Sequence, residues 1–444
     1  MTTDQENNVS FAHKASFTAL IPFFAFIVFY FGLSLAINDF YKVPMIIAFV
    51  IASAVSMCLD RKTKLGDKIE IYAKGMGDVN IMIMCLIFVL AGIFTGTVKG
   101  MGAVDSVITI ARNFIPQNLF LIGFFLISCF ISLAMGTSCG TIAAVTPIAA
   151  GLIAPLHINP ALMIGAVIGG SMFGDNLSVI SDTTIAATRT QSVKMRDKFF
   201  ANIKIVVPAV ILTIIIYLCA GQVEEYSSTV SPVTARDYLA ALPYIAVLVL
   251  AIAGVNVMAL LFSGTILAYI IGIMTGAFDF WNALDLCGKG ALDMSETLIV
   301  AILAGGMLGI IRYNGGINYI IKKISLYASS PKGCEFGIFL LVSIINLFTA
   351  NNTVAIVIAG PIAKDLSQKF QCNAKRIASI LDTASCTVQG IIPYGAQILI
   401  AMGIVKIAGI TEISTWELIS HMYYPMFIGI STLASILLTK RTAK

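Results

Sequence analysis

A run of polar and small residues, Met172 to Thr184, interrupts an otherwise apolar segment that extends from Pro160 to about Ala187. Its sequence, MFGDNLSVISDTT, is rich in glycine, aspartate, asparagine, serine and threonine, which favour bonds to their own backbone over a continuous helix. We therefore expect the helix to break here. Unpaired backbone at membrane depth survives only where it is buried in protein or lines a polar cavity. An aspartate at the bilayer centre also costs about 3 kcal/mol, so the stretch is a candidate functional site.

Composition places the chain among polytopic membrane proteins. Hydrophobic residues make up 58% of the 444 residues and charged residues only 11%. The nine cysteines form no CxxC pair and lie mostly in apolar segments, which argues against a zinc site or a disulfide framework. No P-loop is present, and membrane topology alone accounts for the basic residues. We expect no enzymatic activity, no cofactor and no nucleic-acid partner; the lipid bilayer is the expected partner.

A second polar interruption lies between residues 116 and 157. Two apolar halves of about seventeen residues, each marginal for a full span, flank the sequence GTSCGT at 136–141. This pattern predicts a re-entrant hairpin, with Thr137 and Ser138 at a tip near the membrane midplane. Two short spans joined by a tight loop are the alternative.

The second half of the chain repeats the first at a nearly constant offset. The sequence KGMGD at 74–78 recurs as KGALD at 289–293, an offset of 215, and Pro147 recurs as Pro361, an offset of 214. Chance matches would not keep one offset over so long a stretch. Internal symmetry of this kind is common in secondary transporters.

We therefore predict an all-α polytopic membrane protein built from two inverted repeats with discontinuous helices at the midplane. Each repeat has about five transmembrane helices and one re-entrant hairpin, and an odd number of crossings turns the second repeat upside down. The predicted boundaries are 1–222 for the first repeat, with hairpin 116–157 and broken helix 160–187, and 235–444 for the second, with hairpin 331–366 and broken helix 377–403.

The distribution of basic residues predicts the orientation. If both termini are cytoplasmic, 21 of the 28 lysines and arginines fall in cytoplasmic segments and six in outside segments, with Lys204 at the inner end of a span. This bias agrees with the positive-inside rule. We expect a multi-pass protein of the bacterial cytoplasmic membrane with both termini inside.

The sequence FGDNLSVISDTT at 173–184 resembles the signature of the NhaC family of sodium/proton antiporters, in which Gly-Asp-Lys and Ser-Asp-Thr-Thr bracket a short spacer. The resemblance covers nearly the whole chain. It implies membership of the ion transporter superfamily, whose inverted repeats contain two hairpins and two broken helices. Asn351-Asn352-Thr353 is similar to the Ser-Asn-Thr hairpin-tip motif of sodium-coupled dicarboxylate carriers. Asn176 replaces the lysine of the signature and removes a positive charge beside Asp175.

Sodium is a hard cation that prefers oxygen ligands such as carboxylates, hydroxyls and unwound carbonyls. The candidate residues for cation binding and proton coupling are Asp175, Asn176, Ser178, Ser181, Asp182, Thr183 and Asp382, with Asp175 and Asp182 as the sodium-binding carboxylates. A proton and a cation that compete for one carboxylate give antiport without further machinery. Two alternatives are structural: Asp182 as the cap of the second half-helix, helped by Ser181, and Asp382 as a charge neutralised by Arg376 or a helix-end hydroxyl.

The second half supplies neutral hydrogen-bonding groups in greater number than a bare sodium site requires. Together with the first hairpin tip they suggest a candidate substrate site of Thr137, Ser138, Asn351, Asn352, Thr353, Gln389 and Tyr394, and Gln397 is a further neutral group of this half. We predict a secondary active transporter, a sodium/proton antiporter of the inner membrane. The alternative is a sodium- or proton-coupled transporter or exchanger of a small organic acid or amino acid. A channel is disfavoured because no filter-like repeat of carbonyls is present, and a homodimer is an open possibility.

The inverted topology makes a labelling prediction. Cysteine introduced at Thr229 should react with an impermeant reagent added outside, and cysteine at Thr190 only with reagent added inside. Labelling of both positions from the same side would contradict the inverted repeat.

Overall fold

The computed structural model describes residues 15–37, 43–59, 63–114, 116, 119–178, 181–220, 232–327, 330–411 and 413–438. All regular secondary structure in these residues is helical. Six helical stretches among them are long and apolar enough to cross a membrane: Val79–Gly100, Pro160–Gln191, Met195–Ala220, Val257–Met274, Phe280–Tyr313 and Pro331–Thr349. The predicted class, an all-α polytopic membrane protein, is confirmed. Thr229 and both termini lie outside the described residues, so the orientation stays a prediction.

The chain forms two compact units whose boundaries differ from those of the predicted repeats. One unit consists of residues 1–82 and 299–329, and the other of residues 83–298 and 330–444. Each unit therefore contains parts of both halves of the sequence. The repeats themselves, with their inversion, stay a prediction.

The first unit is built around aromatic and glycine contacts. Phe26 and Phe49 stack with ring centroids 4.3 Å apart, and the Tyr72 hydroxyl donates to the Leu303 carbonyl at 3.2 Å. Its helices, together with the nearby parts of α5 (Val79–Gly100) and α15 (Ser295–Tyr313), are η1 (Thr18–Leu20), α1 (Ile21–Ile27), η2 (Val28–Gly32), α2 (Leu33–Ile37), α3 (Met45–Cys58), α4 (Leu65–Met76) and α16 (Gly316–Tyr327).

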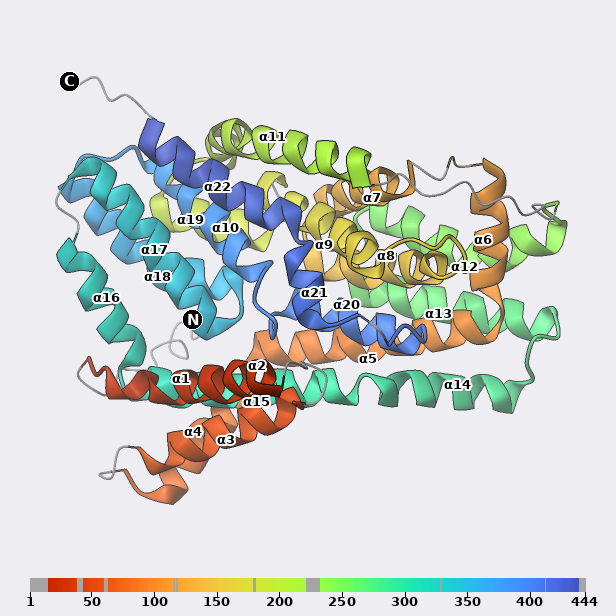
Figure 1. Ribbon diagram of the computed structural model, residues 1–444, viewed down its shortest axis with the longest axis horizontal. Coiled ribbons are helices and arrows are strands. Elements are labelled where there is room, and N and C mark those ends of the chain that lie inside the picture. Colours follow the sequence, from red (N-terminus) through yellow and green to blue (C-terminus); the bar gives the residue numbers. More distant parts are fainter. Residues whose placement is uncertain are drawn as a thin grey trace, which may run out of the picture. The chain divides into compact units, whose positions relative to one another are not determined.

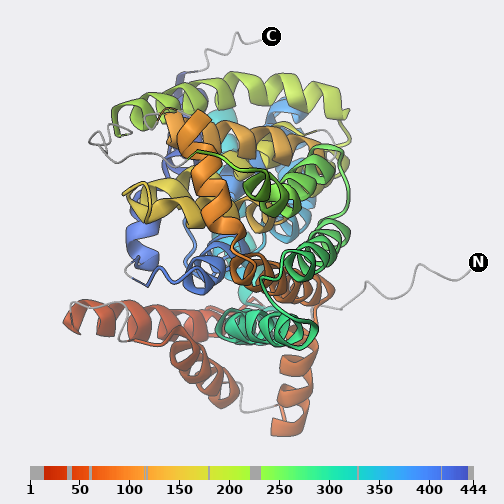
Figure 2. The same ribbon diagram turned by 90° about the vertical axis from the view of Figure 1, so that its right-hand side faces the viewer.

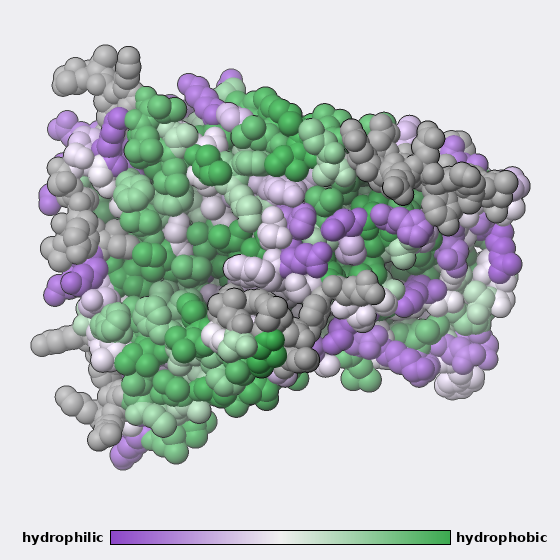
Figure 3. Space-filling model, in the orientation of Figure 1, coloured by the Kyte–Doolittle hydropathy of each residue, from purple (hydrophilic) through white to green (hydrophobic). Residues whose placement is uncertain are grey.

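The second unit holds every element with a predicted functional residue (Figure 1). Its helices are α6 (Ala103–Phe114), α7 (Phe120–Met135), α8 (Ser138–Ile153), α9 (Pro160–Leu177), α10 (Asp182–Gln191), α11 (Met195–Ala220), α12 (Ala235–Ile252), α13 (Val257–Met274), α14 (Phe280–Asp293), α17 (Pro331–Thr349), α18 (Asn352–Lys369), α19 (Ala374–Gln389), α20 (Ala396–Ile407), α21 (Thr415–Ser420) and α22 (Tyr423–Leu438). Apolar side chains of α11, including Ile211 and Leu218, are about half exposed, as lipid contact requires. Hydrophobic areas cover much of the surface seen in Figure 3.

Two tight helical hairpins occupy the predicted positions. Between α7 and α8 the chain turns at Gly136, whose φ of 69° is left-handed and suits glycine, and Thr137 then precedes the first residue of α8. Between α17 and α18 the same turn is made at Ala350, with φ 48°, followed by Asn351. Each tip therefore ends one helix and starts the next within two residues.

One helix ends and another begins within each segment predicted to contain a broken helix. The first break lies between α9, which ends at Leu177, and α10, which begins at Asp182. The second lies between α19, which ends at Gln389, and α20. Helices α8, α9 and α10 begin at residues 138, 160 and 182, and α18, α19 and α20 each begin 214 residues later, at residues 352, 374 and 396.

Hairpins and broken helices from distant parts of the sequence lie side by side (Figures 1 and 2). Helix α8 packs against α9 and α20, and α18 packs against α10 and α19. Each hairpin thus contacts broken helices from both halves of the chain. This arrangement brings the two tips and the two breaks together.

Small residues set how closely α9 approaches α7. A Cβ atom at Gly170 would meet the Phe125 carbonyl oxygen and would lie 2.8 Å from Ser128 Cβ. We predict that Gly170→Ala destabilises the protein by about 1–3 kcal/mol, the usual effect of overpacking, measured as a lower Tm in detergent. The control is Gly123→Ala on α7, where a Cβ meets nothing within 4 Å. An equal Tm for the two variants would contradict the close approach.

Candidate functional site

Asp175, in the last turn of α9, is the residue on which both hairpin tips converge. Its side chain is buried. The carboxylate accepts the Ser138 backbone N–H at 3.1 Å and the Ser138 hydroxyl at 2.5 Å. The Asn352 side-chain amide donates to it from the second tip at 3.5 Å. Because Ser138 and Asn352 are the first residues of α8 and α18, the carboxylate lies at the positive ends of two helix dipoles.

The second broken helix extends this cluster by a chain of hydrogen bonds. The Gln397 amide donates to the Ser138 hydroxyl oxygen at 3.0 Å. Gln389, on the other side of the same break, donates to Gln397 Oε1 at 2.7 Å and to the Ala350 carbonyl at 3.0 Å. The four discontinuities of the second unit are thereby connected through Ser138.

The hydroxyls that follow the first break satisfy backbone rather than the Asp175 carboxylate. The Asp175 carbonyl accepts the Ser181 hydroxyl at 2.8 Å, the Thr183 hydroxyl at 3.0 Å and the Thr184 hydroxyl at 3.4 Å. A helix that ends inside the protein leaves its last carbonyls without helical partners, and these hydroxyls supply them. Ser181 also caps α10 by accepting the Thr184 N–H.

A second polar cluster lies at the C-terminal end of α9 and contains a buried ion pair. Lys198 Nζ lies 2.7 Å from Asp382 Oδ2, and both side chains are fully buried. The ammonium also donates to the Asn176 carbonyl at 2.8 Å and to the Thr184 hydroxyl at 2.7 Å. Asn202 donates to the same two acceptor groups, the Asn176 carbonyl and the Asp382 carboxylate, at 2.7 Å each. Lys198 and Asn202 therefore cap the C-terminal end of α9 from α11.

The sequence analysis did not single out these two residues. Helix α10 ends at Gln191 and α11 already begins at Met195, so both residues lie in the first two turns of α11. The spacing of four residues between Lys198 and Asn202 puts both on one face of α11. Two polar residues on one face at the start of an apolar span were the available signal.

The structure gives the positions and partners of the two other aspartates. The cap of α10 is Ser181, whereas Asp182 is its first residue and is exposed. Asp382 is neutralised, as the alternative stated, but by Lys198 rather than Arg376. Arg376 instead pairs with Glu335 at 3.0 Å.

Several predicted residues lie near the clusters without joining the Asp175 carboxylate. Asn176 donates to the Tyr424 hydroxyl at 3.0 Å, and Ser178 donates to the Leu133 carbonyl at 3.0 Å. Tyr394 donates to the Leu347 carbonyl at 2.6 Å. At the tips, Asn351 caps α18 through the Val354 N–H, Thr353 donates its N–H to Asn352 Oδ1, and the Thr137 carbonyl accepts from Thr141. These side-chain and backbone contacts stabilise the tips and breaks near the carboxylate.

The donor set at Asp175 suits a monovalent cation better than a multivalent one. The described residues contain no cluster of three or more histidine, cysteine or acidic side chains that could hold a metal ion. A cation at Asp175 would therefore be held by one carboxylate and neutral oxygens. The Ser138 hydroxyl and the Gln397 amide oxygen belong to this hydrogen-bonded cluster and are ligand types that hard cations accept.

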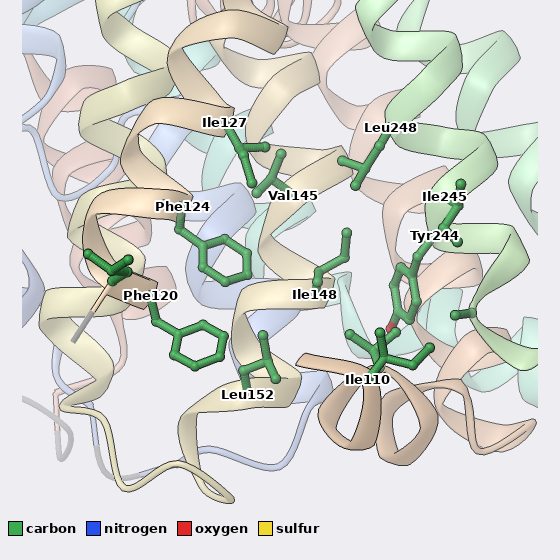
Figure 4. A pocket seen from close by; sticks show the side chains of 14 residues that line it. Ile110, Phe120, Phe124, Ile127, Val145, Ile148, Leu152, Tyr244, Ile245 and Leu248 are labelled. Atoms are coloured by element: carbon green, nitrogen blue, oxygen red, sulfur yellow. The ribbon is translucent and has the colours of Figure 1, made fainter. Parts of the chain in front are cut away.

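An apolar pocket of about 230 Å³ lies among α6, α7, α8 and α12 (Figure 4). Phe120, Phe124, Ile148 and Leu152 line it, and Tyr244 is its one residue with a side-chain oxygen. Such a lining offers no ligand set for a cation, so this pocket is not part of the ion site.

Comparison with known proteins relates the whole chain to transporters. The model of a family described as "Na+/H+ antiporter family" matches residues 2–222 and again residues 223–439. A malate-2H(+)/Na(+)-lactate antiporter of Bacillus subtilis is 24% identical over 88% of this chain and 89% of its own length. The Na(+)/H(+) antiporter NhaC of Alkalihalophilus pseudofirmus is 24% identical, with coverages of 80% and 82%. The arginine/ornithine antiporter ArcD of Halobacterium salinarum is 21% identical over 72% of each chain.

The buried ion pair makes a stability prediction. Asp382→Leu leaves the Lys198 ammonium buried without its counter-ion and should destabilise the protein by about 3–5 kcal/mol. The double variant Lys198→Met/Asp382→Leu should be more stable than this single variant, because it removes both charges. Thermal unfolding in detergent measures both. The control is Asp285→Asn, which breaks an exposed pair with Lys289 and should change Tm little. A double variant less stable than Asp382→Leu would contradict the assignment.

Proposed function

Because the chain belongs to the Na+/H+ antiporter family, a family of secondary active transporters, we propose that it exchanges sodium for protons and that Asp175 is the group for which the two ions compete. The observation that carries this proposal is the convergence of both hairpin tips on the Asp175 carboxylate. It is a buried carboxylate in a setting of neutral donors, at the meeting point of discontinuous helices. Secondary transporters bind their ions in such places.

The competition follows from the burial of Asp175. A buried carboxylate is costly unless its charge is compensated, and a bound proton or a bound sodium ion would each neutralise it. The Ser138 hydroxyl can serve both states, because a hydroxyl has one donor hydrogen and two acceptor lone pairs. It donates to the bare carboxylate, as observed, and by rotating it would present a lone pair to a cation. One ion must therefore leave before the other binds.

Asp382 is the weaker candidate for this role. Its carboxylate already has the Lys198 ammonium at 2.7 Å and the Asn202 amide as partners, so a sodium ion would have to displace a positive charge. We assign this pair to holding α9, α11 and α19 together around the break. Asp182 is exposed and makes none of the hydrogen bonds described for the Asp175 cluster, so we do not assign it to the ion site.

A second candidate function is sodium- or proton-coupled exchange of a small organic acid or amino acid. The observation that favours it is that α8, α10, α18 and α20 all begin beside the cluster. Helix N-termini favour anions such as a substrate carboxylate. The amides of Gln389, Gln397 and Asn352 add neutral donors. Two of the related proteins named above are antiporters of organic acids or amino acids.

We further propose the cytoplasmic membrane as the site of action, with both termini inside. The excess of lysine and arginine in the segments assigned to that side supports this orientation.

Asp175→Asn tests the ion site. The substitution preserves size but removes the charge, so the apparent sodium affinity should fall by at least about tenfold, since interactions with a charged group contribute about 1.5–3 kcal/mol. Folding should be retained because a neutral amide is easier to bury. The measurement is sodium-dependent dissipation of an imposed pH gradient in proteoliposomes with equal protein content. The matched control is Asp182→Asn, which should transport normally. Unaltered sodium dependence in Asp175→Asn would refute the assignment.

The same assay separates the two candidate functions. Sodium alone should dissipate the gradient if the protein is a sodium/proton antiporter. If sodium, lithium and potassium have no effect until malate, lactate or an amino acid is added, the second candidate is correct.

A further inference from the structure

A polar pocket of about 430 Å³ lies between α11, α19 and α22 and plays no part in the site described above. We call it the α11–α19 pocket. Its lining includes charged residues of both helices, and the residues that matter here are Asp197, Ala201, Lys204, Lys375, Arg376 and Ser379. Lys375 and Asp197 form an ion pair at 3.1 Å across the pocket wall, with both side chains partly exposed. A wall of this kind remains hydrated, unlike the apolar pocket in Figure 4.

The floor of the α11–α19 pocket adjoins the buried Lys198–Asp382 pair. The same two helices form both features. Ser379 precedes Asp382 by three residues on α19, which places the two on one face about 4.5 Å apart along the helix axis. On α11, Ala201 directly precedes Asn202. On α19 the lining of the pocket therefore ends about one helical turn before Asp382, and on α11 it extends past Lys198 and Asn202.

Two buried oxygens mark the connection between the pocket and the pair. The Ser379 hydroxyl and Asn202 Oδ1 have no hydrogen-bond partner in the part of the chain that the structure describes. Ser379 is 1% exposed and lines the pocket, whereas Asn202 is fully buried and donates its amide to Asp382. Buried polar atoms in proteins are almost always hydrogen-bonded, and ordered water provides the partner where protein does not. The position of both oxygens fits water that continues inward from the pocket.

We infer that the α11–α19 pocket is the mouth of a water-filled path that reaches the Lys198–Asp382 pair from one face of the membrane. Water is the ligand of this path, together with the protons that move along hydrogen-bonded water. Lys198 and Asn202 both bind the carbonyl of Asn176, the neighbour of Asp175. The path thus brings water to the C-terminal end of α9, the helix that carries Asp175. The inference of this path does not depend on whether Asp175 binds sodium or an organic substrate.

Cysteine accessibility tests the path without relying on transport. Ser379→Cys and Ala201→Cys, each in the full chain, should react with an impermeant methanethiosulfonate reagent from the same single side in oriented vesicles. Their rates should exceed that of Ile380→Cys by at least about tenfold, because Ser379 and Ala201 line the pocket and a thiol there is reached through water. Ile380 is fully buried, follows Ser379 in the chain and does not line the pocket. The unsubstituted protein gives the background from its own cysteines.

Two results would overturn the path. One is labelling of Ser379→Cys and Ala201→Cys at the rate of Ile380→Cys; the other is equal labelling from both sides. Ala201→Cys keeps the test valid if Ser379→Cys folds poorly, because it leaves every described polar contact of the pocket intact. Sodium-dependent transport by the same variants is a separate measurement, so failure of the path and failure of the proposed exchange can be told apart.

Discussion

The need to satisfy unpaired backbone inside a membrane is the constraint on which the second unit depends. A helix that ends at membrane depth leaves carbonyl and N–H groups for which lipid provides no hydrogen-bond partners. The Asp175 carbonyl is served by Ser181 and Thr183, the Asn176 carbonyl by Lys198 and Asn202, and the Ser138 N–H by the Asp175 carboxylate. Most polar residues of the break therefore form hydrogen bonds with backbone groups and not with the Asp175 carboxylate. The proposed ion site consists of the one carboxylate that is left with neutral donors when these bonds are made.

The two buried aspartates have different surroundings, which is why we propose different roles for them. Asp382 is paired with an ammonium, so its charge is compensated within the protein, and the pair joins α11, α19 and the end of α9. Asp175 has hydroxyl and amide donors but no basic partner among the described residues. We propose that a transported ion compensates its charge. Whether a buried carboxylate is available to bind an ion here depends on whether its neighbours already neutralise its charge.

Much of the local structure could be predicted because its signals are local. Glycine at the first tip, asparagine at the second and the polar run after Leu177 all disfavour a continuous helix, and the structure ends helices at these positions. The roles of individual side chains were harder to predict. Ser178 and Thr183 looked like cation ligands, yet both donate to carbonyls. The sequence does not specify the hydrogen-bond partner of a hydroxyl group, because that partner depends on how the helices pack.

The sequence by itself determined the membrane class, the two hairpins, the two breaks and Asp175 as a buried acid, because hydropathy and helix-breaking residues act over a few neighbouring positions. The tertiary structure alone decided the partners. Lys198 stands at the end of an apolar segment, where a lysine ordinarily reaches water. It is buried only because α11 packs against α9 and α19, which carry its acceptors Asn176 and Asp382 from positions 22 and 184 residues away in the chain. Pairing over such separations depends on how helices pack, and no local pattern encodes it.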